Sequence, residues 1–235
     1  MYNLYLSTLV FYIFKYKMAP KTQPNFMKLV KEKKSFLILV YLSLIIQLLI
    51  TYSILFGLRN TPSINKYTKQ AWWVYFIILI AIILLLTFVK MPTWLQFIVF
   101  TVFSIVFGCF LYSGTQLVSI ELISSALEGA ITVFLVMSVV AVILAYIGID
   151  LSWMGMILFV ALIGVLIASI IVSFSKDTAL KKAVLFVILV LFAIFVLFQT
   201  NTMLQKNYNE NFVQASLDFY LDFVNIFTAI LGLDE

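Results

Sequence analysis

Two aspartates one helical turn apart are the residues of this chain best suited to chemistry. Asp218 and Asp222 lie in an otherwise apolar C-terminal segment, and their i, i+4 spacing places both carboxyls on one face of a helix. Two carboxyls held close together at low dielectric do not both ionise readily, so such a pair responds to protons. The pattern predicts a cation site or a pH-gated latch in a pore. The alternative is a buried Asp222 that hydrogen-bonds to neighbouring helices, with Asp218 near the membrane interface.

The surroundings of these aspartates make them costly. A carboxylate at the centre of a membrane helix costs about 2.5–3.5 kcal/mol on insertion scales, whereas each apolar residue returns roughly 0.3–0.6 kcal/mol. The segment is therefore marginal in lipid by itself. We expect it to insert only where both carboxylates face protein, water or a bound cation.

Other polar residues stand in or at the ends of apolar segments. Gln199 and Asn201 end the sixth segment, where they line a cavity facing Asp222 or are ordinary boundary residues. Glu128, in the fourth segment, faces a water-filled cavity or extends to the interface. Lys90 ends the second segment, as a membrane anchor or as a cation that pairs with the carboxylates and holds a pore closed.

Composition restricts the class of protein. The 235 residues are 64% hydrophobic and 11% charged, with a mean hydropathy of +1.15, which indicates a polytopic membrane protein. The absence of histidine excludes Ser-His-Asp triads and histidine zinc sites, and Cys109 alone forms no intrachain disulfide. An intramembrane aspartyl protease is disfavoured because both aspartates share one segment. We expect no enzyme, and the net charge of +5 near membrane ends favours anionic lipid over nucleic acid as a partner.

Seven apolar segments of roughly 17–25 residues predict an all-α, seven-transmembrane-helix bundle. They span residues 36–57, 71–89, 94–112, 123–146, 153–174, 183–204 and 212–233. We assign residues 1–34 to a basic N-terminal tail with a short apolar stretch, and 35–233 to the transmembrane domain. Five lysines before the first segment, against three positive charges in the next loop, favour a cytosolic N-terminus. The C-terminus lies outside if the last segment spans the membrane, and in the cytosol if that segment dips in and returns.

Four stretches in order along the chain resemble the Bax-inhibitor/lifeguard (transmembrane Bax inhibitor motif) family. Residues 219–227, FYLDFVNIF, resemble the family signature LYLDFINLF, and residues 40–51, VYLSLIIQLLIT, resemble its first-helix pattern VYxxLxxQLLxT. Residues 90–92, KMP, fall where the family carries a basic-basic-x-Pro turn, and residues 197–201, LFQTN, fall where it carries a YDTQ-like helix end. The resemblance covers about residues 36–233.

The resemblance implies a bundle in which six helices surround a central one. Members are associated with a calcium leak from internal stores or across the bacterial plasma membrane, and many suppress cell death. In bacterial members two aspartates on the last two helices share a proton, and an arginine near the end of the second helix latches one of them. Asp222 matches the last-helix aspartate, as a weak and transient calcium contact, and Lys90 approximately matches the latch. Gln199 replaces the other aspartate, so we expect a weaker pH response, with Asp218 as a possible substitute carboxylate.

These inferences make a calcium-permeable leak channel of intracellular membranes the leading hypothesis, one that lowers store calcium and suppresses apoptosis. Calcium is the permeant ion and no cofactor is expected. The Golgi or the endoplasmic reticulum is the expected location, and the bacterial plasma membrane is the alternative. Candidate partners, besides the lipid bilayer, are cell-death regulators and calcium-release channels. The runner-up is a non-conducting membrane scaffold that inhibits cell death through protein partners. Source organism, oligomeric state and start codon are left open.

Overall fold

The computed structural model describes residues 26–59, 72–205 and 211–234. Within these ranges the regular structure is helical, which confirms the all-α membrane bundle expected from the sequence. Most of the basic tail and the loop that carries Lys66 and Lys69 lie outside the described residues. The helices are α2 (Phe26–Arg59), α4 (Trp72–Phe88), α5 (Thr93–Thr115), α6 (Ile120–Tyr146), α7 (Gly155–Ser173), α8 (Thr178–Gln205) and α9 (Phe212–Asp234), with a 3-10 turn, η2 (Ser152–Met154), before α7.

Length and apolar composition make six of the described helices candidates to cross a membrane. These are the 30 residues Val30–Arg59 of α2, the whole of α5, α6, α8 and α9, and η2 together with α7. The apolar part of α4, Trp73–Phe88, is shorter. A helix rises about 1.5 Å per residue, so about 20 residues span the hydrocarbon core. The chain is therefore an integral membrane protein.

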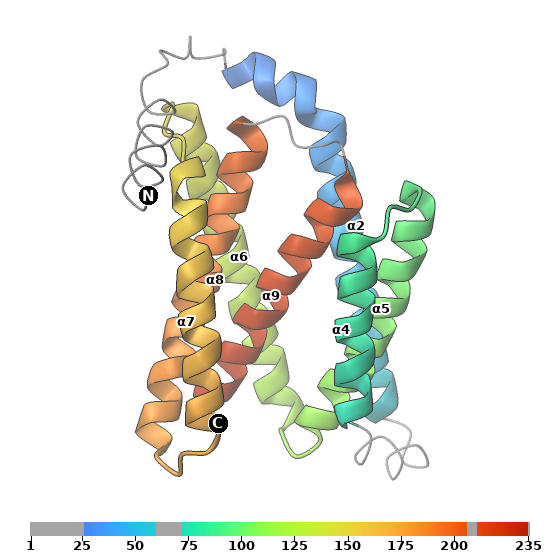
Figure 1. Cartoon of the computed structure of the whole chain (residues 1–235), viewed down its shortest axis with the longest axis vertical. Helices are drawn as coiled ribbons and strands as arrows, with labels where there is room; N and C mark the ends of the chain where they lie inside the picture. Colours follow the sequence, from blue (N-terminus) through green and yellow to red (C-terminus); the bar gives the residue numbers. More distant parts are fainter. Residues whose placement is uncertain (1–25, 60–71, 206–210, 235) are drawn as a thin grey trace, which may run out of the picture.

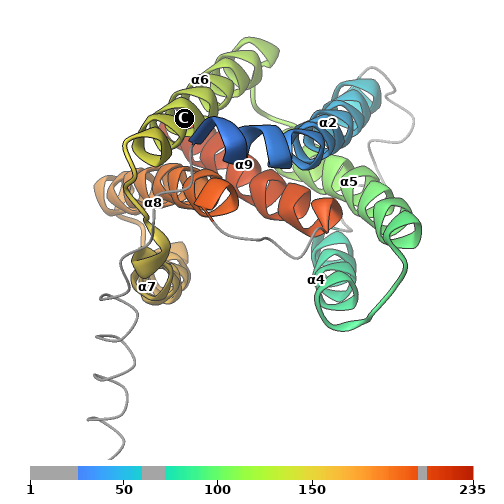
Figure 2. The same ribbon diagram turned by 90° about the horizontal axis from the view of Figure 1, so that it is seen from above.

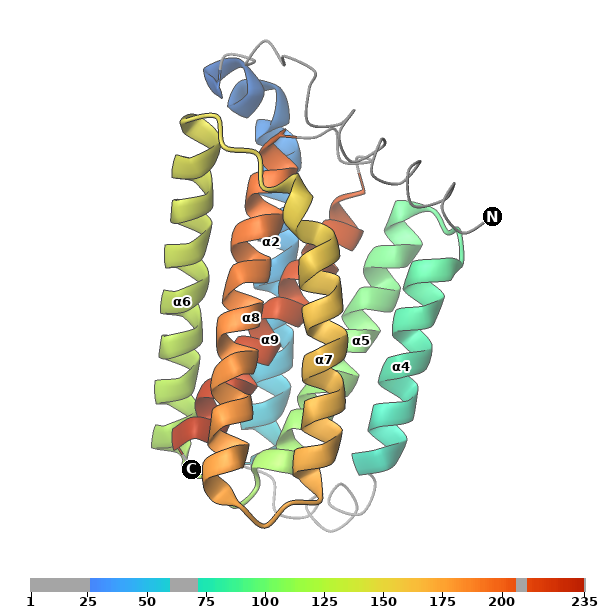
Figure 3. The same cartoon turned by 60° about the vertical axis from the view of Figure 1, so that its left-hand side comes forward.

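Successive helices run in alternate directions along the long axis of the bundle (Figure 1). Helix α2 begins at the upper end and α9 finishes at the lower end, which Figure 3 shows from a second side. Helix α9 continues without a break from Phe212 to Asp234. The last segment therefore crosses the bundle once and does not dip in and return.

Helix α9 is the central helix (Figure 2). It packs against α8, α6 and α2, and less extensively against α5. Helices α4 and α7 differ from the expected ring of six, because α4 packs mainly against α5 and α7 against α8. The centre is consequently formed by five helices, with α4 and α7 outside them.

Aromatic side chains fill the space between α9 and its neighbours. The ring of Tyr220 packs edge-on against Phe100, Phe103 and Phe107 of α5, with ring centroids 5.5–5.8 Å apart. On the adjacent face of α9, Phe219 stacks on Tyr41 of α2 at 5.6 Å. Edge-to-face contacts of this kind add to the area that the rings bury, so they fix the rotation of α9 within the bundle.

Candidate functional site

Asp222 lies in the middle of α9 and is only 4% exposed. Its neighbours along the helix, Phe219, Phe223 and Ile226, are buried as well. The Oδ2 atom of Asp222 is buried and has no hydrogen-bond partner among the described residues. This oxygen therefore receives no hydrogen bond from a neighbouring helix in the part of the chain that the structure describes.

Asp218 lies one turn before Asp222 and is partly exposed. The two carboxyl groups interact electrostatically across this turn. The structure therefore brings the two aspartates together, as their spacing predicts. It places them in different surroundings, with Asp222 inside the bundle and Asp218 at its surface.

Close to Asp222, a chain of hydrogen bonds connects α9 to α2 and α5. Thr51 Oγ1 of α2 lies 2.6 Å from the Tyr220 hydroxyl and donates to the Ser104 carbonyl of α5 at 3.0 Å. A threonine hydroxyl has one proton, so Tyr220 is the donor to Thr51. One threonine thus connects three helices, at a position where every group involved is buried.

A second contact anchors the first part of α9. Ser216 Oγ lies 2.9 Å from the Val40 carbonyl of α2, and it also lies 2.6 Å from the Phe212 carbonyl of its own helix. At the very start of α9, the Asn211 amide donates to Gln96 Oε1 of α5 at 2.7 Å, while its own oxygen accepts from the Val213 backbone. These contacts fix the height and rotation of the helix, which keeps Asp222 inside the bundle.

Helices α2, α6 and α8, all packed against α9, carry further buried polar atoms without partners among the described residues. They are Ser43 Oγ, Gln47 Oε1, Tyr52 Oη, Arg59 Nη1, Ser138 Oγ, Gln199 Oε1, Thr200 Oγ1 and Thr202 Oγ1. Leaving such an atom unsatisfied costs about 1–3 kcal/mol. Hydroxyl and amide oxygens also hydrogen-bond to water and coordinate hard cations. Because these atoms lie on helices that pack against α9, the interior of the bundle around α9 is the candidate site.

Gln199 and Lys90 differ in how they relate to this site. Gln199 lies on α8, which packs along α9, and its side-chain oxygen is buried. No hydrogen bond joins it to Asp222 within the described part of the chain. Lys90 is exposed in the connection between α4 and α5, and an ion pair from Lys90 to either aspartate is not formed in this structure. Its latch role stays a prediction.

Asn201 and Glu128 have surroundings other than a cavity. The Asn201 side chain accepts from the Leu151 backbone at 3.0 Å and donates to the Ile149 carbonyl at 2.9 Å. It therefore clamps the connection between α6 and α7 and does not line a cavity. Glu128 is exposed on α6, so of its two alternatives the structure favours a side chain that reaches outward.

Three basic side chains that belong to none of the sequence motifs cap helix ends. Lys33 Nζ of α2 donates to the Met203 carbonyl at the end of α8 at 2.8 Å, and Arg59, at the opposite end of α2, donates to the Thr115 and Val118 carbonyls at the end of α5. Lys182 of α8 donates to the Leu233 carbonyl of α9 at 2.8 Å. Cations at these positions complement the negative ends of the helix dipoles. The sequence does not reveal these contacts, because each basic residue lies on a different helix from the one whose end it caps.

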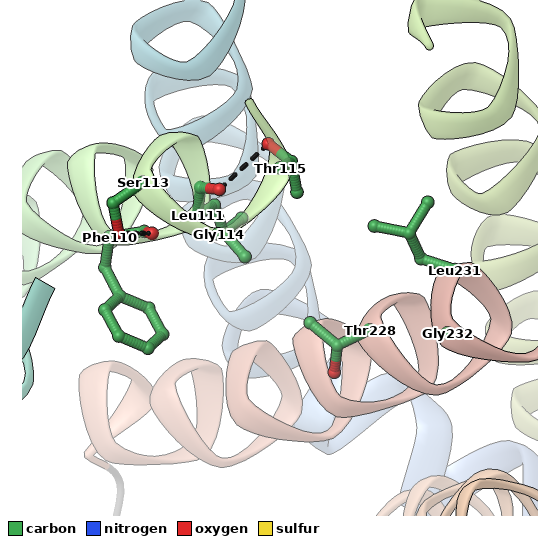
Figure 4. A pocket seen from close by; sticks show the side chains of 8 residues that line it. All are labelled: Phe110, Leu111, Ser113, Gly114, Thr115, Thr228, Leu231 and Gly232. Atoms are coloured by element: carbon green, nitrogen blue, oxygen red, sulfur yellow. Dashed lines mark hydrogen bonds between the residues drawn. The ribbon is translucent and has the colours of Figure 1, made fainter. Parts of the chain in front are cut away.

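A pocket of about 340 Å³ opens between the lower ends of α5 and α9 (Figure 4). Its α5 side contains Ser113, Gly114 and Thr115, and its α9 side contains Thr228 and Gly232. The hydroxyls of Ser113 and Thr115 donate to carbonyls of their own helix. This pocket lies about one and a half turns beyond Asp222 along α9.

The carboxylates fall short of a fixed metal site. Among the residues that the structure describes, no three His, Cys, Asp or Glu side chains lie together. A stable calcium site takes six to eight oxygen ligands, several of them carboxylate. The interior holds one buried carboxyl group, on α9, and neutral oxygens on the helices that pack against α9, which is fewer carboxylates than a stable calcium site has.

Comparison with known proteins finds one family. The model of the family described as "Inhibitor of apoptosis-promoting Bax1" matches residues 33–233, which is most of the chain. No curated protein sequence matches the chain.

Proposed function

The chain belongs to the Bax inhibitor family, and from this premise we propose that it is a calcium-permeable leak pathway of an intracellular membrane. A passive leak lowers the calcium held in internal stores and so reduces its release during apoptosis. Calcium would be the permeant ion, and the Golgi or the endoplasmic reticulum would be the location. Membership of this family already supports a membrane protein that inhibits apoptosis; the calcium pathway is the further step.

The observation that carries the proposal is the buried, unpartnered carboxylate of Asp222. An ionisable side chain inside a membrane-spanning segment is expensive and usually serves transport, proton transfer or ligand binding. Partnerless oxygens on α2, α6 and α8 give a cation neutral ligands on the other sides. Asp222 would contact the ion, Gln199 would supply a neutral oxygen, and Asp218 would add negative charge at the edge of the path.

Calcium flux into proteoliposomes tests this role. Asp222→Asn keeps the size and shape of the side chain and removes the negative charge, so we expect the rate of calcium entry to fall about tenfold or more, which corresponds to about 1.4 kcal/mol of barrier. Asp177→Asn is the matched control. Asp177 is exposed before α8, where it caps the helix by accepting from the Ala179 and Leu180 backbones. Asparagine caps equally well, so this variant should keep the wild-type rate.

A second candidate function is a non-conducting scaffold that suppresses cell death through protein partners. The replacement of the family's second aspartate by Gln199 favours it, because the inner face then lacks a carboxyl pair between α8 and α9. Calcium entry no faster than into empty liposomes, from protein with intact helical structure, would support the scaffold. Retained protection of cells by Asp222→Asn would do the same.

A further inference from the structure

One face of α9 is left open along most of its length. From Val213 to Ala229, every residue is buried except Gln214, Asp218, Leu221, Asn225 and Thr228. Their spacing of four, three, four and three residues places them in a single row on the helix. We call this row the polar stripe, since four of its five side chains are polar. A central membrane helix thus presents polar groups toward the outside of the bundle.

The contacts of α9 show where the polar stripe points. Phe219 and Phe223 face α2 and α6, since they pack against Tyr41, Tyr52 and Phe134. The stripe is on the opposite side of the helix, at about 100° per residue. It therefore lies in the gap between α5 and α8, the helices on either side of α9 in Figure 2.

The outer helices form apolar walls on this side. Figure 2 shows α4 and α7 on the same side of the bundle, apart from each other, with α9 behind them. Helix α4 exposes large apolar side chains such as Phe76 and Ile77, and α7 exposes Phe159 and Ile170. The polar stripe therefore lies between two helices whose exposed side chains are apolar.

The polar stripe extends across a large part of the thickness of a bilayer's hydrocarbon core. From Gln214 to Thr228 it covers fifteen residues, whose fourteen rises of 1.5 Å give about 21 Å of a hydrocarbon core about 30 Å thick. Exposure is greatest at its two ends, Gln214 and Thr228, and lower at the three residues between them. At the Thr228 end the stripe leads into the 340 Å³ pocket between α5 and α9 (Figure 4).

We propose that the polar stripe carries phospholipid head groups across the bilayer, which makes this protein a lipid scramblase. Acyl chains would stay in the membrane against α4 and α7, while the head group follows the stripe. The amides of Gln214 and Asn225 suit the phosphate, because the Asn225 amide keeps one N–H besides the one that it donates to the Leu221 carbonyl. The carboxylate of Asp218 suits the ammonium group of a zwitterionic lipid, and so does the hydroxyl oxygen of Thr228, whose proton is donated within its own helix. Polar groups that face hydrocarbon are expensive, whereas a passing head group adds polar and charged contacts to them. The movement needs no energy source and does not require Asp222, although both pathways include Asp218.

A dithionite assay on proteoliposomes tests the proposal. The vesicles contain phosphatidylcholine with a trace of fluorescent phosphatidylcholine in both leaflets, and dithionite bleaches only the dye that reaches the outer leaflet. We expect bleaching of the inner-leaflet dye with wild-type protein and not with empty vesicles. A water-soluble dye enclosed in the same vesicles must keep its fluorescence, which separates lipid movement from entry of dithionite through a leak.

Substitutions in the polar stripe locate the path. Gln214→Leu, Asn225→Leu and Thr228→Val combined should slow scrambling about tenfold or more, the factor given by about 1.4 kcal/mol of barrier. The matched control is Thr132→Val on α6, an exposed threonine on the side of the bundle away from α4 and α7, and it should keep the wild-type rate. This control removes a hydroxyl that, like that of Thr228, donates to the carbonyl one turn earlier.

A gain-of-function variant covers the case in which the triple variant fails to fold. Leu221 is the apolar member of the polar stripe and lies in its middle. Leu221→Asn makes the stripe continuously polar, so scrambling should become faster than in wild type. The proposal is overturned if wild-type protein moves no tracer above empty vesicles, or if Leu221→Asn and the triple variant both scramble at the wild-type rate. Calcium entry measured in the same preparations fails or succeeds separately, because it depends on Asp222.

Discussion

The hydroxyl of Tyr220 on the central helix donates a hydrogen bond to Thr51 on α2, 2.6 Å away, and the Thr51 hydroxyl donates one to the Ser104 carbonyl of α5. The two stretches of sequence that most resemble the Bax inhibitor family therefore contact each other directly. Val40 and Tyr41, at the start of the first stretch, also contact α9, through Ser216 and Phe219. Both stretches therefore contribute to the interface that holds the central helix in place.

Substitutions at this contact should reduce stability unequally. Tyr220→Phe removes one hydroxyl and leaves Thr51 bonded to Ser104, so we expect a loss of about 1 kcal/mol. Thr51→Val removes the contacts of the Thr51 hydroxyl with both Tyr220 and the Ser104 carbonyl, two buried groups, and should cost about 1–3 kcal/mol. Thermal unfolding in detergent measures both. A larger loss for Tyr220→Phe than for Thr51→Val would contradict the donor assignment.

Close approach of α2 and α5 should make Gly108 intolerant of a side chain. A Cβ at this position would lie 2.7 Å from the Thr51 carbonyl oxygen and 2.8 Å from Ile54 Cβ. Gly108→Ala must push the helices apart, and we expect it to destabilise the protein by about 1–3 kcal/mol. Gly114→Ala on the same helix is the control, because a Cβ there meets no atom within 4 Å. Equal melting temperatures for the two variants would show that the helices do not pack this tightly.

The hydrogen bond by which Lys33 caps α8 should contribute more to the stability of the protein than a surface positive charge does. Lys33→Met keeps the length of the side chain and loses the hydrogen bond to the Met203 carbonyl, so we expect a loss of about 1–2 kcal/mol. Lys34→Met removes an exposed positive charge from the next residue. The melting temperature should fall clearly for the first variant and little for the second. If both fall alike, general charge at this end of the bundle is responsible.

A carboxyl at position 199 should make calcium flux depend on pH. Gln199 does not ionise, so the wild-type inner face holds Asp222 with Asp218 as its titratable neighbour. Gln199→Asp adds a carboxyl on α8, and two carboxyls in one site share a proton. We expect flux to change more between pH 6 and pH 8 in this variant than in wild type, and Gln199→Asn to behave as wild type. Superimposable pH curves for all three proteins would remove Gln199 from the site.

The sequence predicted the helices well because each is a long apolar run, and an apolar run in lipid must satisfy its backbone hydrogen bonds as a helix. It missed the first ten residues of α2, which begins at Phe26 and not at residue 36. This part of the helix is rich in lysine, a good helix former that hydropathy does not reveal. Local chemistry decides where such a helix begins, while the expected boundary marked only where the apolar stretch begins.

The site was harder to predict because a small rotation decides burial. Asp218 and Asp222 lie about 40° apart around α9, and the boundary between the interior and the polar stripe falls between them. Gln199 and Asn201 are neighbours in sequence but point about 200° apart, so they do not line one cavity. Contacts between distant segments, such as Asn201 with the connection before α7, leave no local pattern in the chain.

We propose that Asp222, whose Oδ2 atom is buried without a hydrogen-bond partner among the described residues, serves transport and not folding, and Asp222→Leu tests this claim most directly. Calcium entry into proteoliposomes is measured together with the melting temperature of the same preparation. Removing a buried, unsatisfied carboxylate should stabilise the protein by about 1–3 kcal/mol, while calcium entry falls to the level of empty vesicles. Calcium entry at the wild-type rate through Asp222→Leu would contradict the account.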